Sequence, residues 1–287
     1  MSLEFLDPLL ARGEGELIAD YAGRLPMDVI ARMLGVPRAD EESLRDWTNA
    51  LLDREEGIPD VTPAGIDAAI SLFKYFSQFV TDRRTAIAAG NSPDDLTTAL
   101  CAAGEGDDAL TDEQVLGFCF LLIIAGNETT TKLLANCLLA LQRFPGERRK
   151  LVDDPARIPA AIEEILRYEG STQFMARTLT RPVDLHGERM PEGAKVLLLL
   201  GSANRDERVW SDPDVFAVDR SSSVQHLGFG HGIHVCLGAA LARLEMRVSL
   251  EEILRRMPDY EIDEVRCTRV HSGNVRGWAS VPIRCAR

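Results

Sequence analysis

The first two thirds of the chain carry apolar residues at three- and four-residue spacing, the pattern of amphipathic helices. This spacing predicts helices over residues 14–34, 40–53, 62–89, 94–102, 111–144 and 155–168. Gly35 and Pro37 stop the first of these, Thr111 opens the fifth with a capping signature, and Pro145 and Gly146 end it. The first 168 residues are therefore expected to be mainly helical.

The pattern changes after Gly170, where short β-type runs alternate with turn residues such as His186 and Gly187. Runs of this kind predict strands and hairpins. Residues 204–226 are polar and rich in Pro and Asp, like the long loops that usually carry function. A last helix is predicted over residues 239–257.

These elements predict a mainly α (α+β) fold and a single domain over residues 1–287. Its expected parts are a mainly helical region at 1–168, strands and a long loop at 169–235, a helix after a cysteine at 236–257, and an extended tail at 258–287.

Composition narrows the class of protein. Hydrophobic residues make up 45% and charged residues 27% of the 287 residues, as in ordinary globular proteins. The net charge of -13 argues against nucleic-acid and membrane partners, which need a broad basic face. Six cysteines without a CxxC pair suit free thiols in a reducing cytosol. The apolar run at 115–126 is too short to span a bilayer and predicts a buried core helix. No signal peptide is evident, so we expect a cytoplasmic protein.

The stretch FGHGIHVCLG, residues 229–238, surrounds one cysteine with glycines. Gly230 and Gly232 can adopt a positive φ without strain, and Gly238 allows a bulky group close to the backbone. Cys236 lies just before a predicted helix, whose N-terminus stabilises a thiolate. A thiolate in this position suits a metal or an electrophile.

Three other interpretations of this loop compete. Cys236 could be a buried free thiol in a tight turn. Together with His226, His231 and His234 it could form a zinc site, although the spacing does not match common ligand pairs. A Cys-His hydrolase is the third alternative, but no complete triad is visible in the sequence.

The stretch AGNETTT places Glu128 and Thr129 inside the long apolar helix. Buried charges and hydroxyls cost free energy unless they are paired. The Thr129 hydroxyl can bond the carbonyl of Ala125, four residues earlier, and Gly126 would ease a local opening of the helix. The alternative is a capping or solvent-facing patch.

The stretch EEILR places Glu164 three residues before Arg167, on one face of a helix. Glu163 and Arg167 are an equally good surface pair, worth only about 0.3–0.5 kcal/mol. This motif alone is weak.

Together and in this order, these stretches resemble the cytochrome P450 superfamily of haem-thiolate monooxygenases. FGHGIHVCLG resembles its haem-ligand loop, AGNETT its oxygen-activating helix and EEILR its Glu-x-x-Arg pair. SANRDERVWSDPDVFAVDR resembles the segment before the loop in bacterial members. The resemblance implies a P450-like fold with a long central helix, a small β region and a C-terminal haem-ligand loop and helix.

The resemblance also implies roles for individual residues. Cys236 would be the axial ligand of the iron in haem b, protoporphyrin IX iron. The implied cofactor-binding residues are Arg177, Phe229, Gly230, His234, Cys236 and Gly238, with His234 and Arg177 on the propionates and Phe229 shielding the sulfur. The implied catalytic residues are Ala125 and Gly126, which form the oxygen groove, and Glu128 and Thr129, which relay protons.

Two further sets follow from the resemblance. Glu164, Arg167 and Arg220 would form a buried network that holds the ligand loop. The implied substrate contacts are Leu121, Ile124, Gln173, Met175, Asn274 and Val275.

The implied function is insertion of one atom of O2 into a small apolar organic substrate, with electrons from a ferredoxin- or flavodoxin-type donor. The donor would dock near Arg243 and Arg247, because rim charges steer encounter.

The chain also departs from the family pattern, because complete members carry on the order of a hundred more residues before its first residue. Those residues include propionate-binding side chains and the roof of the substrate pocket. The expectation is an N-terminally truncated chain that binds haem weakly or not at all. The alternative function is a non-catalytic P450-like auxiliary or remnant protein.

Overall fold

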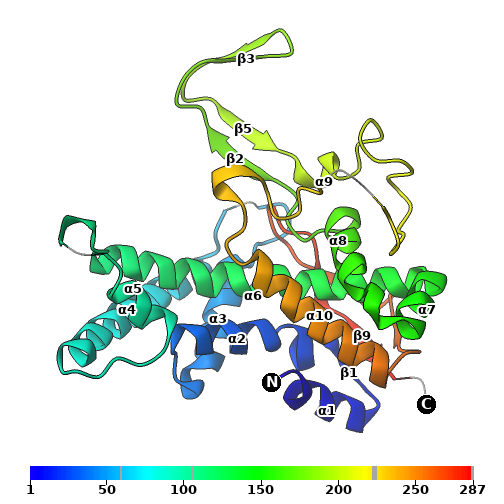
Figure 1. Ribbon diagram of the computed structural model, residues 1–287, viewed down its shortest axis with the longest axis horizontal. Helices are drawn as coiled ribbons and strands as arrows, with labels where there is room; N and C mark the ends of the chain where they lie inside the picture. The colour runs from blue at the N-terminus through cyan, green and yellow to red at the C-terminus, as the bar shows by residue number, and fades with distance from the viewer. Residues whose placement is uncertain (59, 105, 222–224, 286–287) are drawn as a thin grey trace. The chain divides into compact units, whose positions relative to one another are not determined.

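The computed structural model describes the whole chain except residues 59, 105, 222–224 and 286–287 (Figure 1). The chain divides into two compact units. The first comprises Met1–Lys132, Asp259–Gly273 and Trp278–Arg287, and the second comprises Leu133–Pro258 and Asn274–Gly277.

The first unit is mainly helical, as the apolar spacing predicts. Its helices are α1 (Ser2–Arg12), α2 (Leu25–Leu34), α3 (Glu41–Leu52), α4 (Pro63–Ala88), α5 (Leu96–Cys101) and the first part of α6 (Asp112–Arg143), with short π or 3-10 turns at Ile18–Ala22, Arg38–Asp40 and Gly106–Asp108. Thr111 and Gln114 form a reciprocal capping box before α6, in which each backbone N–H donates to the other side chain. Helix α1 was not predicted.

The core of the first unit is an apolar cluster shared by α2, α4 and α6. Its fully buried members include Leu34, Leu72, Phe76, Cys119 and Ile123. Helices α3 and α4 pack along each other, and apolar side chains of α6 are buried in the same cluster. This packing fixes α6, the helix that carries Glu128 and Thr129.

A small antiparallel sheet completes the first unit. It has the order β1-β9-β6, and the strands are β1 (Glu14–Glu16), β9 (Pro282–Arg284) and β6 (Glu261–Ile262). A second ladder pairs β7 (Thr268–Arg269) with β8 (Trp278–Ser280). The prediction of a helix from residue 14 onward is wrong, because Gly13 ends α1 in a left-handed conformation and Gly15 then pairs with Ile283. A partner more than 260 residues away in sequence overrides the local periodicity.

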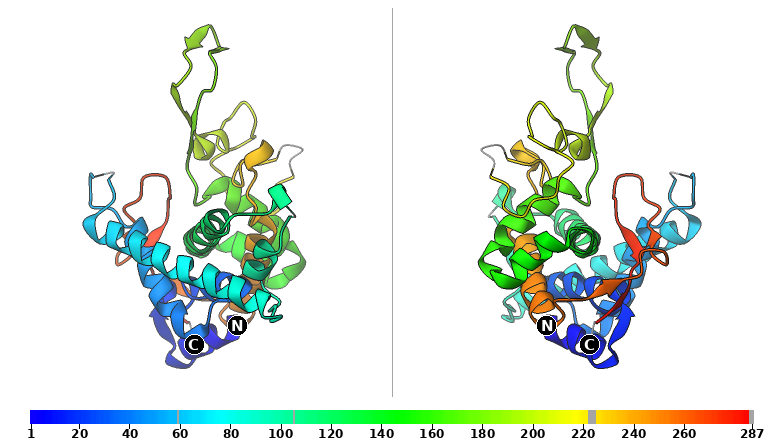
Figure 2. Two further views of the ribbon diagram at one scale, coloured as in Figure 1. Left: turned by 90° about the vertical axis from the view of Figure 1, so that its left-hand side faces the viewer. Right: turned by 90° about the vertical axis from the view of Figure 1, so that its right-hand side faces the viewer.

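The second unit holds the other helices and two hairpins. Its elements are the rest of α6, α7 (Pro145–Asp153), a 3-10 turn at Pro155–Arg157, α8 (Ile158–Tyr168), β2 (Met175–Thr178), β3 (Val183–Leu185), β4 (Glu188–Met190), β5 (Lys195–Leu198), α9 (Leu200–Ala203), η5 (Gly232–His234) and α10 (Ala239–Arg256). Strand β2 pairs with β5, and β3 pairs with β4 across the predicted turn at His186 and Gly187. Figure 2 shows the β3–β4 hairpin at the far end of the β2–β5 ladder, away from α7 and α8. Helices α7 and α9 were not predicted.

Helix α6 is only partly the buried core helix that was expected. Val115, Cys119 and Ile123 are fully buried, whereas Phe118 and Leu121 on the same stretch are exposed. Residues 131–141 are buried throughout. By length and composition α6 could cross a membrane, but half of its most apolar window is buried inside the protein, as in the core helix of a globular fold.

Candidate active site

A tight loop ahead of α10 presents Cys236. The N–H of Cys236 donates to the carbonyl of Phe229 over 2.9 Å, and the N–H of Gly230 donates to the carbonyl of Leu227 over 2.9 Å. Gly230 and Gly232 have φ angles of +71° and +75°, which glycine adopts without strain. The loop therefore closes on the cysteine, as its glycine spacing predicts.

The thiol of Cys236 is exposed and precedes α10, whose N-cap is Gly238. The interpretation as a buried structural thiol is therefore wrong. Apolar side chains flank the thiol, since Ile233 is 97% exposed and Leu237 is 78% exposed. A Cβ added at Gly238 would lie 4.0 Å from the sulfur, so glycine keeps this space open. An exposed thiol with an apolar rim fits a flat apolar macrocycle whose metal takes a thiolate ligand, which is haem.

The zinc alternative is wrong. The part of the chain that the structure describes contains no group of three or more His, Cys, Asp or Glu side chains placed to hold a metal ion. His226 is buried, and its Nδ1 accepts the N–H of Gly228 over 3.0 Å. Its other ring nitrogen, Nε2, therefore carries the proton and donates to Glu163 over 3.0 Å.

Two cationic side chains were predicted to bind haem propionates. His234 is exposed in η5, and Arg177 lies on β2, where its Nη1 donates to the carbonyl of Ala176 over 2.8 Å. Neither side chain forms an ion pair with any residue that the structure describes. Basic side chains without a carboxylate partner among the described residues suit an anionic group of a ligand. The propionate role of both residues stays a prediction.

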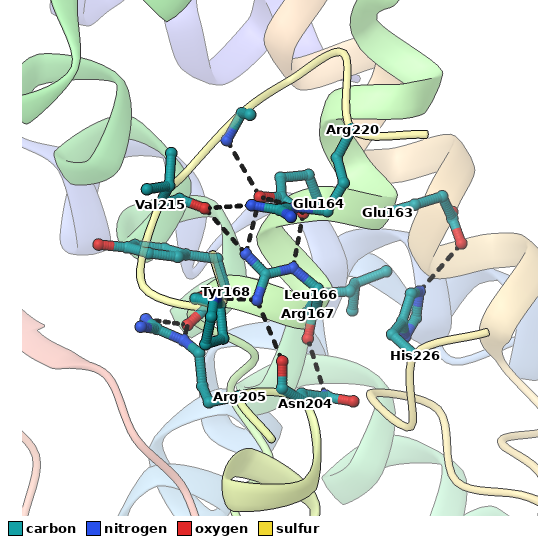
Figure 3. A network of polar contacts seen from close by, with 12 residues as sticks. Glu163, Glu164, Leu166, Arg167, Tyr168, Asn204, Arg205, Val215, Arg220 and His226 are labelled. Carbon is teal, nitrogen blue, oxygen red and sulfur yellow. Dashed lines mark hydrogen bonds and ion pairs between the residues drawn. The ribbon is translucent and has the colours of Figure 1, made fainter. Parts of the chain in front are cut away.

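The Glu-x-x-Arg pair lies on α8 and is fully engaged (Figure 3). Arg167 donates from Nε and Nη2 to the two carboxylate oxygens of Glu164, over 2.7 and 2.8 Å. Its remaining N–H groups donate to the carbonyls of Asn204, Pro213 and Val215. All five donors of this buried guanidinium are therefore used.

Arg220 completes the network from the end of the long loop. Its Nε lies 3.1 Å from both carboxylate oxygens of Glu164, and the N–H of Ala217 donates to the same carboxylate over 3.0 Å. The loop from residue 204 to residue 220 is thus fastened to α8 through Glu164. The predicted contact of Glu164 with Arg167 and Arg220 is present, whereas the alternative pairing of Glu163 with Arg167 is wrong.

Glu163 instead forms a second cluster next to the cysteine loop. It accepts two hydrogen bonds from Arg243 of α10, over 2.6 and 2.8 Å, besides the one from His226. Burial raises the pKa of Glu163, but the hydrogen bonds from Arg243 and His226 outweigh burial and lower it to about 2. The Arg243 guanidinium lies 4.6 Å from the centre of the Phe229 ring, a cation–π distance.

This cluster was missed by sequence reasoning. Arg243 was interpreted as a docking charge for an electron donor, but its guanidinium is held by Glu163 and Phe229. Glu163 and Arg243 are 80 residues apart in the sequence, so no local sequence pattern predicts their contact. Arg247 is half exposed and lies 3.7 Å from Glu251, so it remains available at the surface.

The predicted catalytic residues lie on α6, in the first unit. The hydroxyl of Thr129 donates to the carbonyl of Ala125 over 3.0 Å, as predicted from their spacing. The helix nevertheless runs unbroken through this stretch, and a Cβ at Gly126 would lie 3.3 Å from the Ile30 side chain. Burial raises the pKa of Glu128, and Lys132 and Arg54 oppose this effect.

The predicted substrate residues fall into two sets. Leu121 and Ile124 lie on the part of α6 that belongs to the first unit, and Leu121 is 56% exposed. The set in the second unit comprises Gln173, Met175, Asn274 and Val275. The backbone brings three of these four together, because the N–H of Gln173 donates to the carbonyl of Asn274 over 2.9 Å and Thr172 bridges Val275.

A cysteine loop joined by ion pairs to a Glu-x-x-Arg helix is the arrangement expected of a haem-thiolate protein. Comparison with known proteins agrees, because the cytochrome P450 family matches residues 64–258, more than half of the chain. A Mycobacterium tuberculosis protein that carries the name cytochrome P450 123 is 44% identical over 97% of this chain and 68% of its own length. Cytochrome P450 130 of the same species is 40% identical over 98% of this chain and 69% of its own length.

Solved structures give the same result. A cytochrome P450 of Bacillus megaterium in complex with testosterone superposes with a TM-score of 0.90, at 32% identity over 100% of this chain and 74% of that chain. P450BioI, in complex with an acyl carrier protein that bears hexadec-9Z-enoic acid, gives a TM-score of 0.88 at 35% identity over 99% of this chain and 72% of that chain.

The chain belongs to the cytochrome P450 family. Members of this family are haem-thiolate monooxygenases, so the cofactor is haem and the reactants are O2 and an organic substrate. The named relatives are bacterial.

Proposed function

We propose that the chain is a cytoplasmic monooxygenase that inserts one oxygen atom into an apolar organic substrate, with electrons from a ferredoxin- or flavodoxin-type donor. The observation that carries this proposal is the exposed thiol of Cys236 in a glycine loop that closes on Phe229. Haem bound at this thiol would supply the iron at which O2 is reduced. Gly238 leaves the space beside the sulfur that such a group needs.

The residues of α6 support proton delivery. Thr129 keeps its hydroxyl oriented by donating to the Ala125 carbonyl, and the hydroxyl oxygen can still accept a hydrogen bond from a neighbour. Glu128 is partly buried one position earlier, and burial raises the pKa of its carboxyl. A carboxyl group whose pKa is raised from the acid range toward neutrality is suited to exchange protons at the working pH.

Exposed apolar side chains support an apolar substrate. In the first unit, Phe118 and Leu121 of α6 are exposed, and Ile66, Ile70 and Phe73 form an exposed stripe on α4 at helical spacing. Apolar surface of this kind typically marks a ligand or protein contact. The molecules named in the complexes of two structural neighbours are also largely apolar. Testosterone is bound in one structural neighbour, and a fatty acyl group on a carrier protein in another.

The electron donor is proposed to dock beside the cysteine loop. Arg243 is held by two short hydrogen bonds to Glu163, whereas Arg247 on the next turn of α10 is more exposed and only loosely paired, so Arg247 is the stronger candidate of the two arginines. Docking charges act mainly on the rate of encounter and on its salt dependence.

The carbon monoxide difference spectrum of the reduced, haem-reconstituted chain tests this proposal. A thiolate-type band that disappears in Cys236→Ala supports it. Cys285→Ala is a matched control, since it removes another cysteine side chain and should leave the band unchanged. A chain that is folded by circular dichroism but gives no thiolate band contradicts the proposal and supports the non-catalytic alternative.

A further inference from the structure

Lys132 is a buried cation that the proposed reaction does not yet use. Only 8% of this residue is exposed, and its Nζ donates to the carbonyl of Trp278, at the start of β8, over 3.0 Å. It has no carboxylate partner within ion-pair distance in the described part of the chain. Lysine is almost never fully buried unless it is paired. A buried ammonium with one backbone acceptor therefore needs a reason.

Two carboxylates on different elements act electrostatically on Lys132, although neither lies within ion-pair distance of it. Glu128 lies one helical turn earlier on α6, with glutamate N-terminal to lysine, the favourable order for an i,i+4 pair. Glu16 belongs to β1 and is fixed there, because its carboxylate accepts the N–H groups of Ala19 and Val281. Burial lowers the pKa of Lys132, and both carboxylates raise it.

The charges around Glu128 mirror those around Lys132. Burial raises the pKa of its carboxyl, Lys132 lowers it, and Arg54 and Asp53 act more weakly in opposite directions. Arg54 is held by the carbonyls of Leu51 and Asp53 at the end of α3. Lys132 is therefore the strongest positive influence on Glu128 and is held in place by the backbone of β8.

We propose that Lys132 is a positioning residue that favours the ionised form of the Glu128 carboxyl, so that Glu128 can accept a proton beside Thr129. The role in proton delivery rests on the proposed function. Burial of a carboxyl disfavours its charged form, which is the form that accepts a proton. The ammonium of Lys132, held one turn away, opposes this effect of burial. The hydrogen bond from Lys132 Nζ to the Trp278 carbonyl keeps the ammonium group one helical turn from Glu128.

A purely structural role makes a different prediction. If Lys132 only connects α6 to β8, the titration of its ammonium does not depend on the charge of Glu128. If Lys132 and Glu128 hold each other's charge, removal of one charge changes the titration of the other.

Lysine NMR separates these two cases without haem. The chain contains only four lysines, Lys74, Lys132, Lys150 and Lys195, so their side-chain signals can be assigned by single substitutions. In Glu128→Gln we expect Lys132 to lose its proton at lower pH than in the unsubstituted chain. Lys74 should titrate unchanged. Glu113→Gln, an exposed glutamate on the same helix, is the matched control and should leave Lys132 unchanged.

A stability cycle gives a second readout. The free energy of unfolding in urea is measured for the full chain, for Lys132→Gln, for Glu128→Gln and for the double variant. These four values give the coupling free energy between the two side chains. Glutamine is used at position 132 because it retains an N–H donor for the Trp278 carbonyl. We expect the coupling to change the unfolding equilibrium constant about tenfold at pH 8, or about 1.4 kcal/mol. The coupling should shrink at lower pH, because protonation of Glu128 removes its charge.

The outcomes are distinct. An unchanged Lys132 titration in Glu128→Gln, or a coupling that does not shrink at lower pH, overturns the proposal. In the haem-loaded chain, Lys132→Gln should also shift the pH dependence of product formed per O2 consumed. A missing thiolate spectrum is a failure of the proposed function, and it is distinguishable because neither the NMR titration nor the stability cycle needs haem.

Discussion

Arg167→Met tests whether the Glu-x-x-Arg network stabilises the second unit. Arg167 is 2% exposed, and its guanidinium makes five hydrogen bonds. The substitution removes one of the two cations on Glu164 and leaves Arg220 as the other. It also removes the Arg167 donors from the carbonyls of Asn204 and Pro213.

The magnitude follows from these losses. Each buried polar group left without a partner costs about 1–3 kcal/mol, and two carbonyls lose the donor that this network provides. Removal of one partner from a buried ion pair costs about 3–5 kcal/mol in comparable cases. We therefore expect Arg167→Met to lower the free energy of unfolding by about 3–5 kcal/mol, a large part of the stability of an ordinary domain.

Urea unfolding followed by circular dichroism measures this loss. Limited proteolysis adds a local readout, because the loop that Arg167 holds, residues 204–220, should be cut faster in the variant. Arg208→Met is the matched control, since Arg208 pairs with Asp206 at the surface, and it should unfold like the unsubstituted chain. A loss below about 1 kcal/mol in Arg167→Met would refute the reasoning, because that is the value of a surface pair.

Three further predictions concern the rest of the site. Thr129→Ala should leave haem bound but lower the product formed per O2 consumed, as measured by oxygen uptake against product; unchanged coupling would remove Thr129 from proton delivery. Glu163→Gln should speed hydrogen exchange of the Cys236 amide, because Arg243 then loses its fixed position over Phe229; equal exchange rates would show that the cluster does not support the loop. Burial raises the pKa of Glu245 to about 8, so its protonated form favours the folded state. The stability of the chain relative to Glu245→Gln should therefore fall as pH rises from about 4.3, the unfolded value, to about 8, by up to about 1.4 kcal/mol per pH unit in urea unfolding. A pH-independent difference would contradict this.

The sequence was informative where local chemistry decides the structure. The turn at Gly230 and Gly232 was predictable because these positions need a positive φ, and the Thr129 contact with Ala125 because four residues make one helical turn. Helices α3, α4 and α6 were predicted correctly from the spacing of apolar residues and from the capping residues. In these cases the deciding interaction lies within a few residues.

Prediction failed where a distant partner decides. Residues 14–16 form a strand because they pair with β9 near the C-terminus, and Arg243 pairs with Glu163 of another helix, a contact that was not predicted. Nothing near these positions in the sequence carries that information. The partial exposure of α6 was missed for a related reason, because a run that is apolar on all sides does not reveal which side the rest of the unit covers.

The two adjacent glutamates of α8 explain why the second unit can hold a loop of this length in place. Successive residues of a helix point about 100° apart, so Glu163 and Glu164 face different neighbours. Glu164 binds Arg167 and Arg220 and fixes the segment up to residue 220, while Glu163 binds His226 and Arg243 and fixes the segment around Phe229. One dipeptide thus anchors both ends of the stretch that leads to Cys236. The position of the thiol then depends on two ion-pair clusters, one buried around Glu164 and one partly exposed around Glu163, and loss of either should move it more than loss of any apolar contact in the exposed loop itself.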